Sequence, residues 1–325
     1  MSHGNEKLQN YFSYANTTGH GIIGKHNLSK HNLTFRETSV LLNSRLKLDG
    51  SMNLMRQVVK NKPTVGGFYM NPLVGLYRFP RGEDIAYYKE NFEVYDEGRN
   101  LNIQNWHTSY EDFEQNPYWI TNRILSKENR MHVIVSLSAN LKINDWLSLQ
   151  ARGNVDYIND KVRQQFYAST APALAGANGR YIEMDYQETQ YYGDAILMMK
   201  KQWDAFSLNA ALGVSINDKT VNSTRYDSKT ASLKYANVFN LANIIMNGSA
   251  GLDQKIDARR QLQSLFATAQ LGYNEFVYLD LSARNDWSST LAYTSHEKSG
   301  FFYPSVGFSL IFNKLMTLPQ CCLLY

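Results

Sequence analysis

The sequence predicts an all-β fold, an antiparallel transmembrane β-barrel segment, and three observations support this prediction. Runs in which apolar and polar residues alternate recur along the chain. Tight polar turns join these runs in pairs, and long polar segments separate the pairs. Aromatic residues stand where the runs leave the tight turns. Barrels of this kind need short turns on one side of the membrane and long loops on the other.

Three tight turns share one build, a short polar stretch with an aromatic residue beside it. They are Asn144-Asp145-Trp146, Gln202-Trp203-Asp204-Ala205-Phe206 and Tyr273-Asn274-Glu275-Phe276. A fourth, Asn43-Ser44-Arg45, has the same build without the ring. The repetition indicates that hairpins follow one another with a constant orientation.

Composition narrows the class of protein. No Pro/Gly/Ser-rich linker divides the 325 residues, and the net charge of +4 is spread along the chain, which argues against a nucleic-acid partner. The two cysteines are the adjacent pair Cys321-Cys322, neither a disulfide framework nor a metal motif. No apolar run is long enough for a helical span. A mean hydropathy of −0.42 still permits a barrel, whose strands show lipid only at every second residue.

Ten strands are expected, each alternating in character with period two. The run from Met131 to Ile143 shows the pattern most clearly, and it resumes after the turn from Leu147 to Tyr157. Soluble strands usually span about 5–6 residues, whereas several of these runs continue for roughly 9–13, the reach of a tilted membrane strand. A soluble sandwich or propeller with one wet face is the alternative. The expected strands lie near 10–18, 31–42, 46–58, 131–143, 146–159, 187–201, 205–217, 258–273, 276–287 and 303–312.

The two faces of these strands differ in kind. Small residues such as Gly50, Ala139 and Gly153 share the apolar face, which suits contact with fluid lipid better than a packed core. The other face carries the charges Lys47, Asp49, Lys142, Arg152, Asp156, Asp280 and Arg284. A register slip of one residue would move them into lipid at about 2–4 kcal/mol for each Arg or Lys near the midplane. The charged face is therefore expected to line a watery interior.

Aromatic residues are expected to form two girdles at the membrane interfaces. Trp146, Trp203, Phe206 and Phe276 stand at the tight turns, and Tyr157, Tyr191, Tyr192, Trp287 and Tyr303 stand toward the long loops. The alternative is that these rings simply pack on turns.

Several motifs resemble the SusC/RagA family of TonB-dependent outer-membrane transporters. The most specific is the block from Leu279 to Leu291, read Leu-Asp-Leu-Ser-Ala-Arg-Asn-Asp-Trp-Ser-Ser-Thr-Leu, followed by Phe302-Tyr303-Pro304-Ser305-Val306-Gly307. Others are Gly4-Asn5-Glu6-Lys7, Tyr11-Phe12-Ser13-Tyr14-Ala15-Asn16, Lys47-Leu48-Asp49, Asn71-Pro72-Leu73, Phe79-Pro80-Arg81-Gly82, Gln104-Asn105-Trp106 and Asn116-Pro117-Tyr118-Trp119. The resemblance extends from about residue 3 to residue 320.

This resemblance implies a 22-stranded barrel in the outer membrane, in contact with its lipid and plugged by an N-terminal domain. It also implies a SusD-like lipoprotein as a lid, TonB as the energy source, and oligosaccharides or peptides as substrates. We expect residues 1–320 to be a partial barrel domain that lacks the signal peptide, the plug and the C-terminal strands. Residues 321–325 are expected to be an aberrant tail. An isolated segment of ten strands has two open edges, so we expect it to aggregate unless it closes on itself.

The stretch from 59 to 130 lacks clear periodicity, and loops of this length are usually functional or disordered. Its aromatic residues are candidates for stacking on sugars or gripping peptide side chains, above all Tyr87, Trp106, Tyr118 and Trp119. The alternative is that these rings pack the loop onto its neighbours.

No catalytic residues, metal site or cofactor are expected. Glu83-Asp84 and Asp96-Glu97 are adjacent carboxylates, which point to opposite faces of a strand or are solvated in a loop. His20, His26 and His31 match no zinc spacing, and Asp156, Asn159 and Asp160 offer hard oxygens for calcium without the EF-hand order. The sequence therefore predicts part of a nutrient importer and no enzyme. The alternatives are a soluble or surface-exposed β-rich binding module and an inactive truncated gene product.

Overall fold

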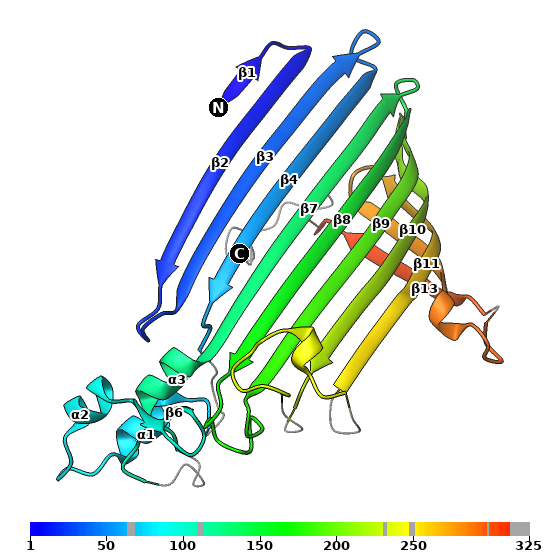
Figure 1. The fold of residues 1–325 in the computed structure, drawn as a ribbon. Coiled ribbons are helices and arrows are strands. Elements are labelled where there is room, and N and C mark those ends of the chain that lie inside the picture. Colours follow the sequence, from blue (N-terminus) through cyan, green and yellow to red (C-terminus); the bar gives the residue numbers. More distant parts are fainter. Residues whose placement is uncertain (64–68, 109–113, 230–232, 247–250, 298, 313–325) are drawn as a thin grey trace.

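The computed structural model of the protein describes residues 1–63, 69–108, 114–229, 233–246, 251–297 and 299–312. One antiparallel sheet of eleven strands dominates it, and each strand pairs with the next along the sheet in the order β1-β2-β3-β4-β7-β8-β9-β10-β11-β12-β13 (Figure 1). The strands are β1 Ser2–Gly4, β2 Leu8–His20, β3 Asn27–Leu41, β4 Leu46–Lys60, β7 Ile124–Lys142, β8 Leu147–Phe166, β9 Arg180–Trp203, β10 Phe206–Asp227, β11 Gly251–Tyr273, β12 Val277–Ser288 and β13 Phe301–Leu310. The predicted fold class is confirmed.

All ten expected strands are present, and β1 is a short addition. Their ends at the tight turns agree with the prediction within about two residues, and left-handed backbone at Asn43, Asp204 and Asn274 lets the chain reverse there. At the opposite ends most strands are longer than expected, and β10, which ends at Asp227 rather than near 217, is extended most. We call the end with the tight turns the short-turn end and the other the long-loop end.

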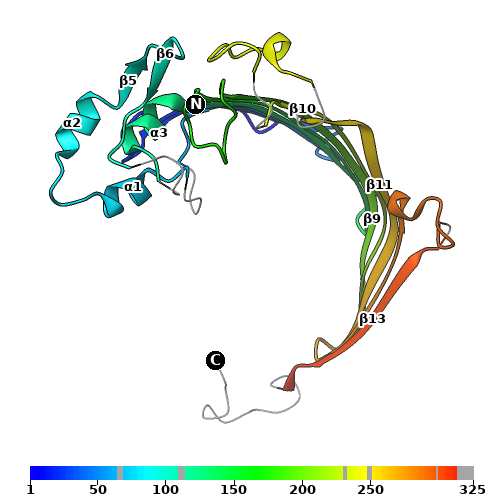
Figure 2. The same ribbon diagram turned by 60° about the horizontal axis from the view of Figure 1, so that its bottom comes forward.

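The sheet is curved into an open arc, with β1 and β2 at one edge and β13 at the other (Figure 2). Hollows in the curve are lined by Asp49, Arg152 and Tyr192, so these side chains mark the concave face. Since successive residues alternate in direction, the register then assigns every strand position to one face.

The apolar positions share the convex face across the register. Leu48, Ala139 and Ala151 stand opposite one another on neighbouring strands, as do Gly50, Leu137 and Gly153. The predicted charges Lys47, Asp49, Lys142, Arg152, Asp156, Asp280 and Arg284 all have the opposite parity and lie on the concave face. The predicted separation of the two faces is therefore confirmed.

Two of the expected strands, 31–42 and 187–201, alternate less clearly than the others, and the register explains both. On β3 the convex face carries Glu37, Ser39 and His31, so the alternation of apolar and polar residues is interrupted. On β9 the concave face carries Ile196 and Met198 beside the convex Leu197, so both faces are apolar and the alternation disappears.

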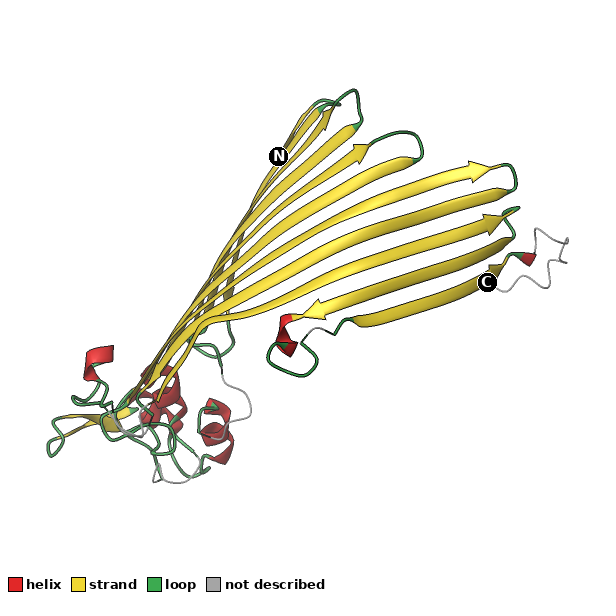
Figure 3. Cartoon of the chain, turned by 90° about the vertical axis from the view of Figure 1, so that its right-hand side faces the viewer, coloured by secondary structure: helices red, strands yellow, loops and turns green. Residues whose placement is uncertain are grey.

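The stretch between β4 and β7 is a folded segment rather than a structureless loop. It contains the helices α1 Pro72–Arg78, α2 Ile85–Glu90 and α3 Pro117–Arg123 and the hairpin of β5 Glu93–Asp96 with β6 Leu101–Gln104, beyond one end of the sheet (Figure 3). Single turns of 3-10 helix, η1 Leu241–Asn243 and η2 Ser289–Leu291, lie in later loops. Within the described residues no helix is long and apolar enough to cross a membrane.

Buried apolar side chains gather at the long-loop end. Phe166, Ala175 and Ile182 form one cluster, and Tyr181, Leu233 and Ile244 form another. By contrast, the apolar side chains of the convex face that begin at the short-turn end, such as Leu147 to Tyr157 on β8, are half-buried or exposed throughout the described part of the chain. The adjacent cysteines Cys321 and Cys322 and the predicted aberrant tail lie outside the described residues.

Candidate functional site

Ion pairs line the concave face from strand to strand. They include Arg36 with Asp49 (2.7 Å), Arg130 with Asp160 (2.6 Å), Arg152 with Asp194 (2.7 Å), Lys219 with Glu188 (2.6 Å) and Arg284 with Asp286 (2.8 Å). At the height of Arg152 and Asp194 the convex face of the same strands carries only small and apolar residues, Ala151, Gly153, Gly193 and Ala195. The curve of the sheet therefore encloses a wall suited to water and polar solutes.

The pair of Arg152 and Asp194 shows how this wall is built. The two residues stand directly opposite each other on β8 and β9. The guanidinium donates to both carboxylate oxygens, and the Tyr192 hydroxyl donates a further bond of 2.7 Å to Asp194 Oδ2. The Asp194 side chain is 1% exposed, whereas that of Arg152 is 47% exposed. A buried carboxylate held by three donors forms a rigid polar floor.

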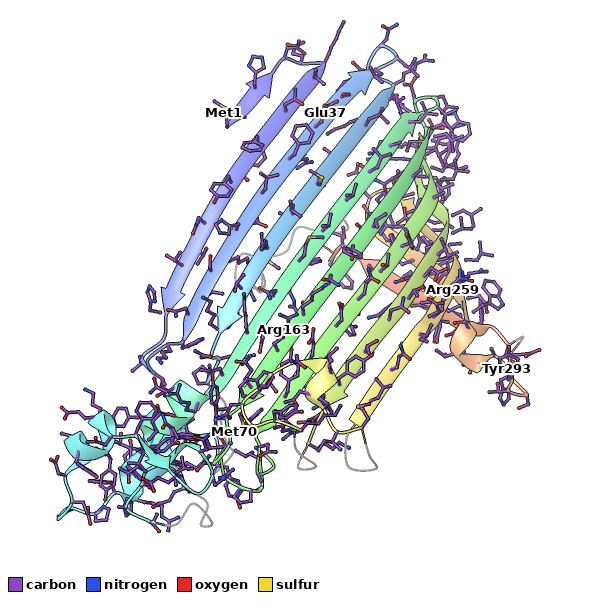
Figure 4. All side chains as sticks on the ribbon, in the orientation of Figure 1. Met1, Glu37, Met70, Arg163, Arg259 and Tyr293 are labelled. Atoms are coloured by element: carbon purple, nitrogen blue, oxygen red, sulfur yellow. The ribbon has the colours of Figure 1, made fainter. Side chains whose placement is uncertain are left out.

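A groove opens at the long-loop end of the concave face, and we call it the mouth groove. It consists of two cavities of about 340 Å³ and 550 Å³ that share Lys62 and Glu128 in their linings. Strand positions from the concave face form its floor, namely Gln57, Ser126, Glu128, Arg130, Asp160 and Gln164. Met70, Pro72 at the start of α1, and Ile120 and Thr121 of α3 form one side, and Figure 4 shows Met70 where the helical segment meets the strands.

Hydrogen bonds fix the helical segment beside this groove. Asn116 caps α3 by accepting from Tyr118 N (2.8 Å), and Pro117 occupies the first turn, where its missing N–H costs nothing. The Asn116 amide donates to Tyr88 O and Asn105 O, and its own N–H donates to Gln104 Oε1 (2.7 Å). These bonds tie α2, β6 and α3 into one packed unit.

A salt bridge and a second loop complete this unit. Arg123 donates to both oxygens of Glu93 at 2.6–2.7 Å, and its guanidinium lies over the rings of Phe92 and Tyr167. The fork geometry raises the pKa of Arg123, chiefly through its hydrogen bond to Glu93. The loop after β8 thereby packs against the segment before β7.

The four aromatic residues predicted to contact substrate are placed differently from one another. Trp119 is 0% exposed and donates from Nε1 to Thr170 Oγ1 (3.1 Å), so the prediction that it grips substrate directly is wrong. Trp106 packs against Phe79 with ring centroids 5.2 Å apart, as well as against Tyr88 and His107. Tyr118 is half-buried and Tyr87 is 50% exposed. None of these four described residues lines the mouth groove.

Of the groove residues, Glu128 and Arg130 were not singled out from the sequence, and Asp160 was considered only as an oxygen ligand for calcium. They lie on parts of β7 and β8 where both faces are polar, so alternation in hydropathy no longer reports which residue faces inward. The available signal is the pairing of charges, since Arg130 and Asp160 stand directly opposite each other once β7 and β8 are in register.

The rings predicted for the short-turn girdle make contacts with their neighbours at the tight turns. Lys201 Nζ lies 5.5 Å from the Trp146 ring centroid and 5.3 Å from that of Trp203, and the rings of Phe206 and Tyr273 are 4.9 Å apart. Phe276 packs edgewise on Tyr273 (5.8 Å). The role of these rings at a membrane interface stays a prediction.

The girdle predicted toward the long loops needs correction. Trp287 stands on the convex face opposite Gln263 and is 40% exposed. Tyr303 stands opposite Arg284, and Tyr192 donates to Asp194, so both belong to the concave face and their assignment to an outward girdle is wrong. Nearness to a long loop indicates the height of a ring along its strand but not its face, which depends on whether the residue number has the parity of the convex or the concave positions.

The metal hypotheses gain no support from the side-chain positions. His20 bonds Asn27 (2.5 Å) and His31 bonds the Tyr14 hydroxyl (2.7 Å). Asp156 and Asp160 face inward, where they bond His132 and Arg130, whereas Asn159 faces outward. The calcium set therefore does not converge. No group of three His, Cys, Asp or Glu suited to a metal occurs among the described residues.

Comparison with known proteins yields structural matches only. The sequence matches no protein-family model and no curated protein. The fold matches the RagAB peptide transporter with a TM-score of 0.71 and 17% identity, over 98% of this chain and 34% of that chain. The RagAB peptide importer in its closed-closed state matches at 0.63 with 19% identity, over 94% of this chain and 33% of that chain.

A third match is more distant in sequence. The Pseudomonas receptor described as P. aeruginosa FpvA bound to a heterologous iron-loaded pyoverdine matches with a TM-score of 0.55 and 11% identity, over 94% of this chain and 35% of that chain. The chain thus spans about a third of the length of these proteins. It has the fold of the matched part of these proteins.

Proposed function

We propose that this chain is a barrel segment of a SusC/RagA-type transporter in an outer membrane, which takes up peptides or glycans with energy from TonB. The observation that carries the proposal is the division of one sheet into an apolar convex face without a dry core and an ion-paired concave face. The fold shared with the RagAB peptide transporter supports it, as do the sequence motifs of that family.

The exposure of the convex face argues for lipid. Leu137 is 59% exposed, Leu212 53%, Val306 73% and Phe308 65%. A soluble monomer rarely exposes a contiguous apolar patch larger than a few hundred Å², and this band runs across the whole sheet. On β8 it extends from Leu147 to Tyr157, which at ~3.3 Å per residue and a tilt of ~45° gives a height of roughly 23 Å, near the ~25 Å of barrel proteins.

The mouth groove is the part of this segment that we assign to the substrate path. The groove is lined by Lys62 and Glu128, a cation and an anion that form no ion pair within the described residues, beside apolar Met70 and Ile120. A zwitterionic peptide supplies the complementary charges as well as apolar side chains, whereas a neutral glycan supplies hydroxyls only. The groove therefore favours peptides over glycans.

Two partners follow from the same proposal. A SusD-like lipoprotein would cover the long-loop end, where the packed α1–α3 unit and the loop after β8 form the rim. TonB would act on a plug in the intact protein. The RagAB structures, whose name denotes a two-component peptide transporter, support the first of these partners.

Binding measurements on the intact transporter test the groove. Replacing Lys62→Gln and Glu128→Gln together is expected to weaken binding of short peptides about tenfold, measured by calorimetry in detergent, and to leave neutral oligosaccharides unaffected. The matched control is Lys47→Gln, which removes a concave cation at the short-turn end. Unchanged peptide affinity would reject the assignment of the groove. Membrane insertion is tested separately, because a chain that stays monodisperse without detergent would favour the soluble binding module.

A further inference from the structure

Beyond the apolar band, the convex face becomes strongly charged, and we call this zone the outer collar. It comprises Lys60, Lys127, Lys161, Arg163, Glu183 and Asp185 on the strands β4, β7, β8 and β9. These residues have the same parity as the apolar band, so they point outward and not into the bore. Figure 4 labels Arg163 toward the long-loop end and Glu37 near the short-turn end of the same sheet.

Three cations of the collar stand side by side. Lys60 pairs in register with Lys127, and Lys127 pairs in register with Arg163. Directly opposite residues have Cβ atoms about 4.5–5.5 Å apart, and like charges in that position destabilise a sheet. All three side chains are exposed. The sheet therefore brings three positive charges together in one row that faces away from the transport path.

The neighbouring cations have partners, and the two lysines do not. Arg163 lies 3.2 Å from Glu183, and Lys161 lies 3.4 Å from Asp185. Lys60 and Lys127 form no ion pair with any described residue. Within the described part of the chain no carboxylate balances these two lysines, so the row can accept an anion supplied by a ligand.

A polar hollow adjoins the cations on the same outward face. Its volume is about 480 Å³, and its lining includes Asn159, Lys161, Asp185, Gln187, Asn222 and Thr224. These side chains donate and accept hydrogen bonds in several directions, as the hydroxyl groups of a sugar require. A row of cations next to such a hollow is complementary to a ligand that carries both phosphate and sugar.

The height of the outer collar above the apolar band indicates where that ligand comes from. Arg163 lies six residues beyond Tyr157, where the apolar band ends, which corresponds to ~20 Å along the strand and roughly 14 Å of height at a tilt of ~45°. Lipid headgroups occupy this level around a barrel. On the proposed membrane location, we infer that the outer collar binds the phosphorylated sugar headgroup of an outer-leaflet glycolipid, with Lys60 and Lys127 as its main phosphate contacts.

Lipid binding by the intact transporter tests this inference. The probe is a phosphorylated glycolipid of the outer leaflet, titrated into the purified protein and counted as bound copies by native mass spectrometry. A cation at an anionic membrane surface contributes about 1 kcal/mol, or about fivefold in affinity. The double substitution Lys60→Gln with Lys127→Gln is therefore expected to weaken binding ~25-fold, and Lys60→Arg with Lys127→Arg is expected to retain it.

The controls separate face from charge and lipid from phosphate. Lys30→Gln removes a cation from the concave face of β3, opposite Gln57, and is expected to change lipid affinity less than twofold. The enzymatically dephosphorylated lipid is expected to bind wild-type protein as weakly as the double Gln variant binds the intact lipid. Free inorganic phosphate at the same concentration is expected not to compete.

Three results would overturn the inference: full lipid affinity in the double Gln variant, equal binding of the dephosphorylated lipid, or competition by free phosphate at matched concentration. Peptide affinity is measured on the same variants and is expected to stay unchanged, because the collar faces away from the mouth groove. If wild-type protein binds no peptide, that result would instead count against the proposed function. Failure of the lipid inference and failure of the proposed function are therefore distinguishable.

Discussion

Replacing Leu137 by arginine is expected to destabilise the folded state in a membrane by about 2–4 kcal/mol, the cost of an arginine on the lipid face near the midplane. Leu137 stands on the convex face between Gly50 and Gly153, in the middle of the apolar band, and is 59% exposed. In water, a change at such an exposed position alters stability by only about 0.5 kcal/mol. The substitution therefore distinguishes lipid from water as the solvent of this face.

The expected change corresponds to a fall of about 30-fold to 900-fold in the ratio of folded to unfolded protein. The assay is refolding of the intact transporter into lipid vesicles over a urea series, with the folded fraction read from heat-modifiable migration on a gel. The control is Ser136→Arg, one residue away at the same depth but on the concave face, opposite Ser51 and Asn154. Equal stability of the two variants would refute the assignment of the faces.

Three further predictions concern the polar wall and the long-loop end. Arg152→Ala leaves the buried carboxylate of Asp194 without its cationic partner and is expected to lower the free energy of unfolding by about 2–3 kcal/mol, less than for a fully buried pair because the guanidinium is half exposed. Combining Arg152→Gln with Asp194→Asn should restore most of this loss in the same urea assay. If it restores none, the pairing argument is contradicted. Trp119→Ala is expected to cost about 3–5 kcal/mol of local stability and to accelerate amide exchange in α3 but not in the strands; unchanged exchange would show that the ring is not part of a core. Burial, and to a smaller extent its hydrogen bond to Glu83, raises the pKa of Tyr88 above its ordinary value, so the stability that neutral Tyr88 contributes is complete below the unfolded-state pKa and is lost as pH rises through the folded-state pKa. In an absorbance titration, Glu83→Gln should lower the pKa of Tyr88 only partway to the ordinary value. A full return to the ordinary value would contradict burial as the larger cause.

The strands could be predicted from the sequence because the two faces of the sheet differ in polarity, which imposes a pattern on alternate residues. Between Met131 and Ile143 successive residues alternate between the convex and the concave face, so the sequence indicates both the strand and its face. Beyond Tyr157 both faces are polar, the alternation ends, and the strands continue unseen to Phe166 and Arg180. The length of the long-loop ends was therefore underestimated.

The candidate site was harder to predict for a different reason. The helices α1 to α3 have only six or seven residues each, too few for a helical period to stand out, and their burial depends on partners far along the chain. Trp119 illustrates this, since its partner Thr170 is 51 residues away. An exposed and a buried tryptophan look alike in sequence, so the ring assigned to substrate proved to belong to a core.

The buried clusters lie only at the long-loop end, so two parts of this chain are stabilised in different ways. On the proposed membrane location, the strands, held by their hydrogen-bonded ladder, are stable only within a bilayer, whereas the unit formed by α1 to α3 and the loop after β8 is organised as a small aqueous domain would be. Detergent should govern the integrity of the first and chaotropes that of the second. If the proposed membrane location holds, substitutions in the rim should follow the packing rules of globular proteins, and substitutions in the sheet should follow those of membrane proteins.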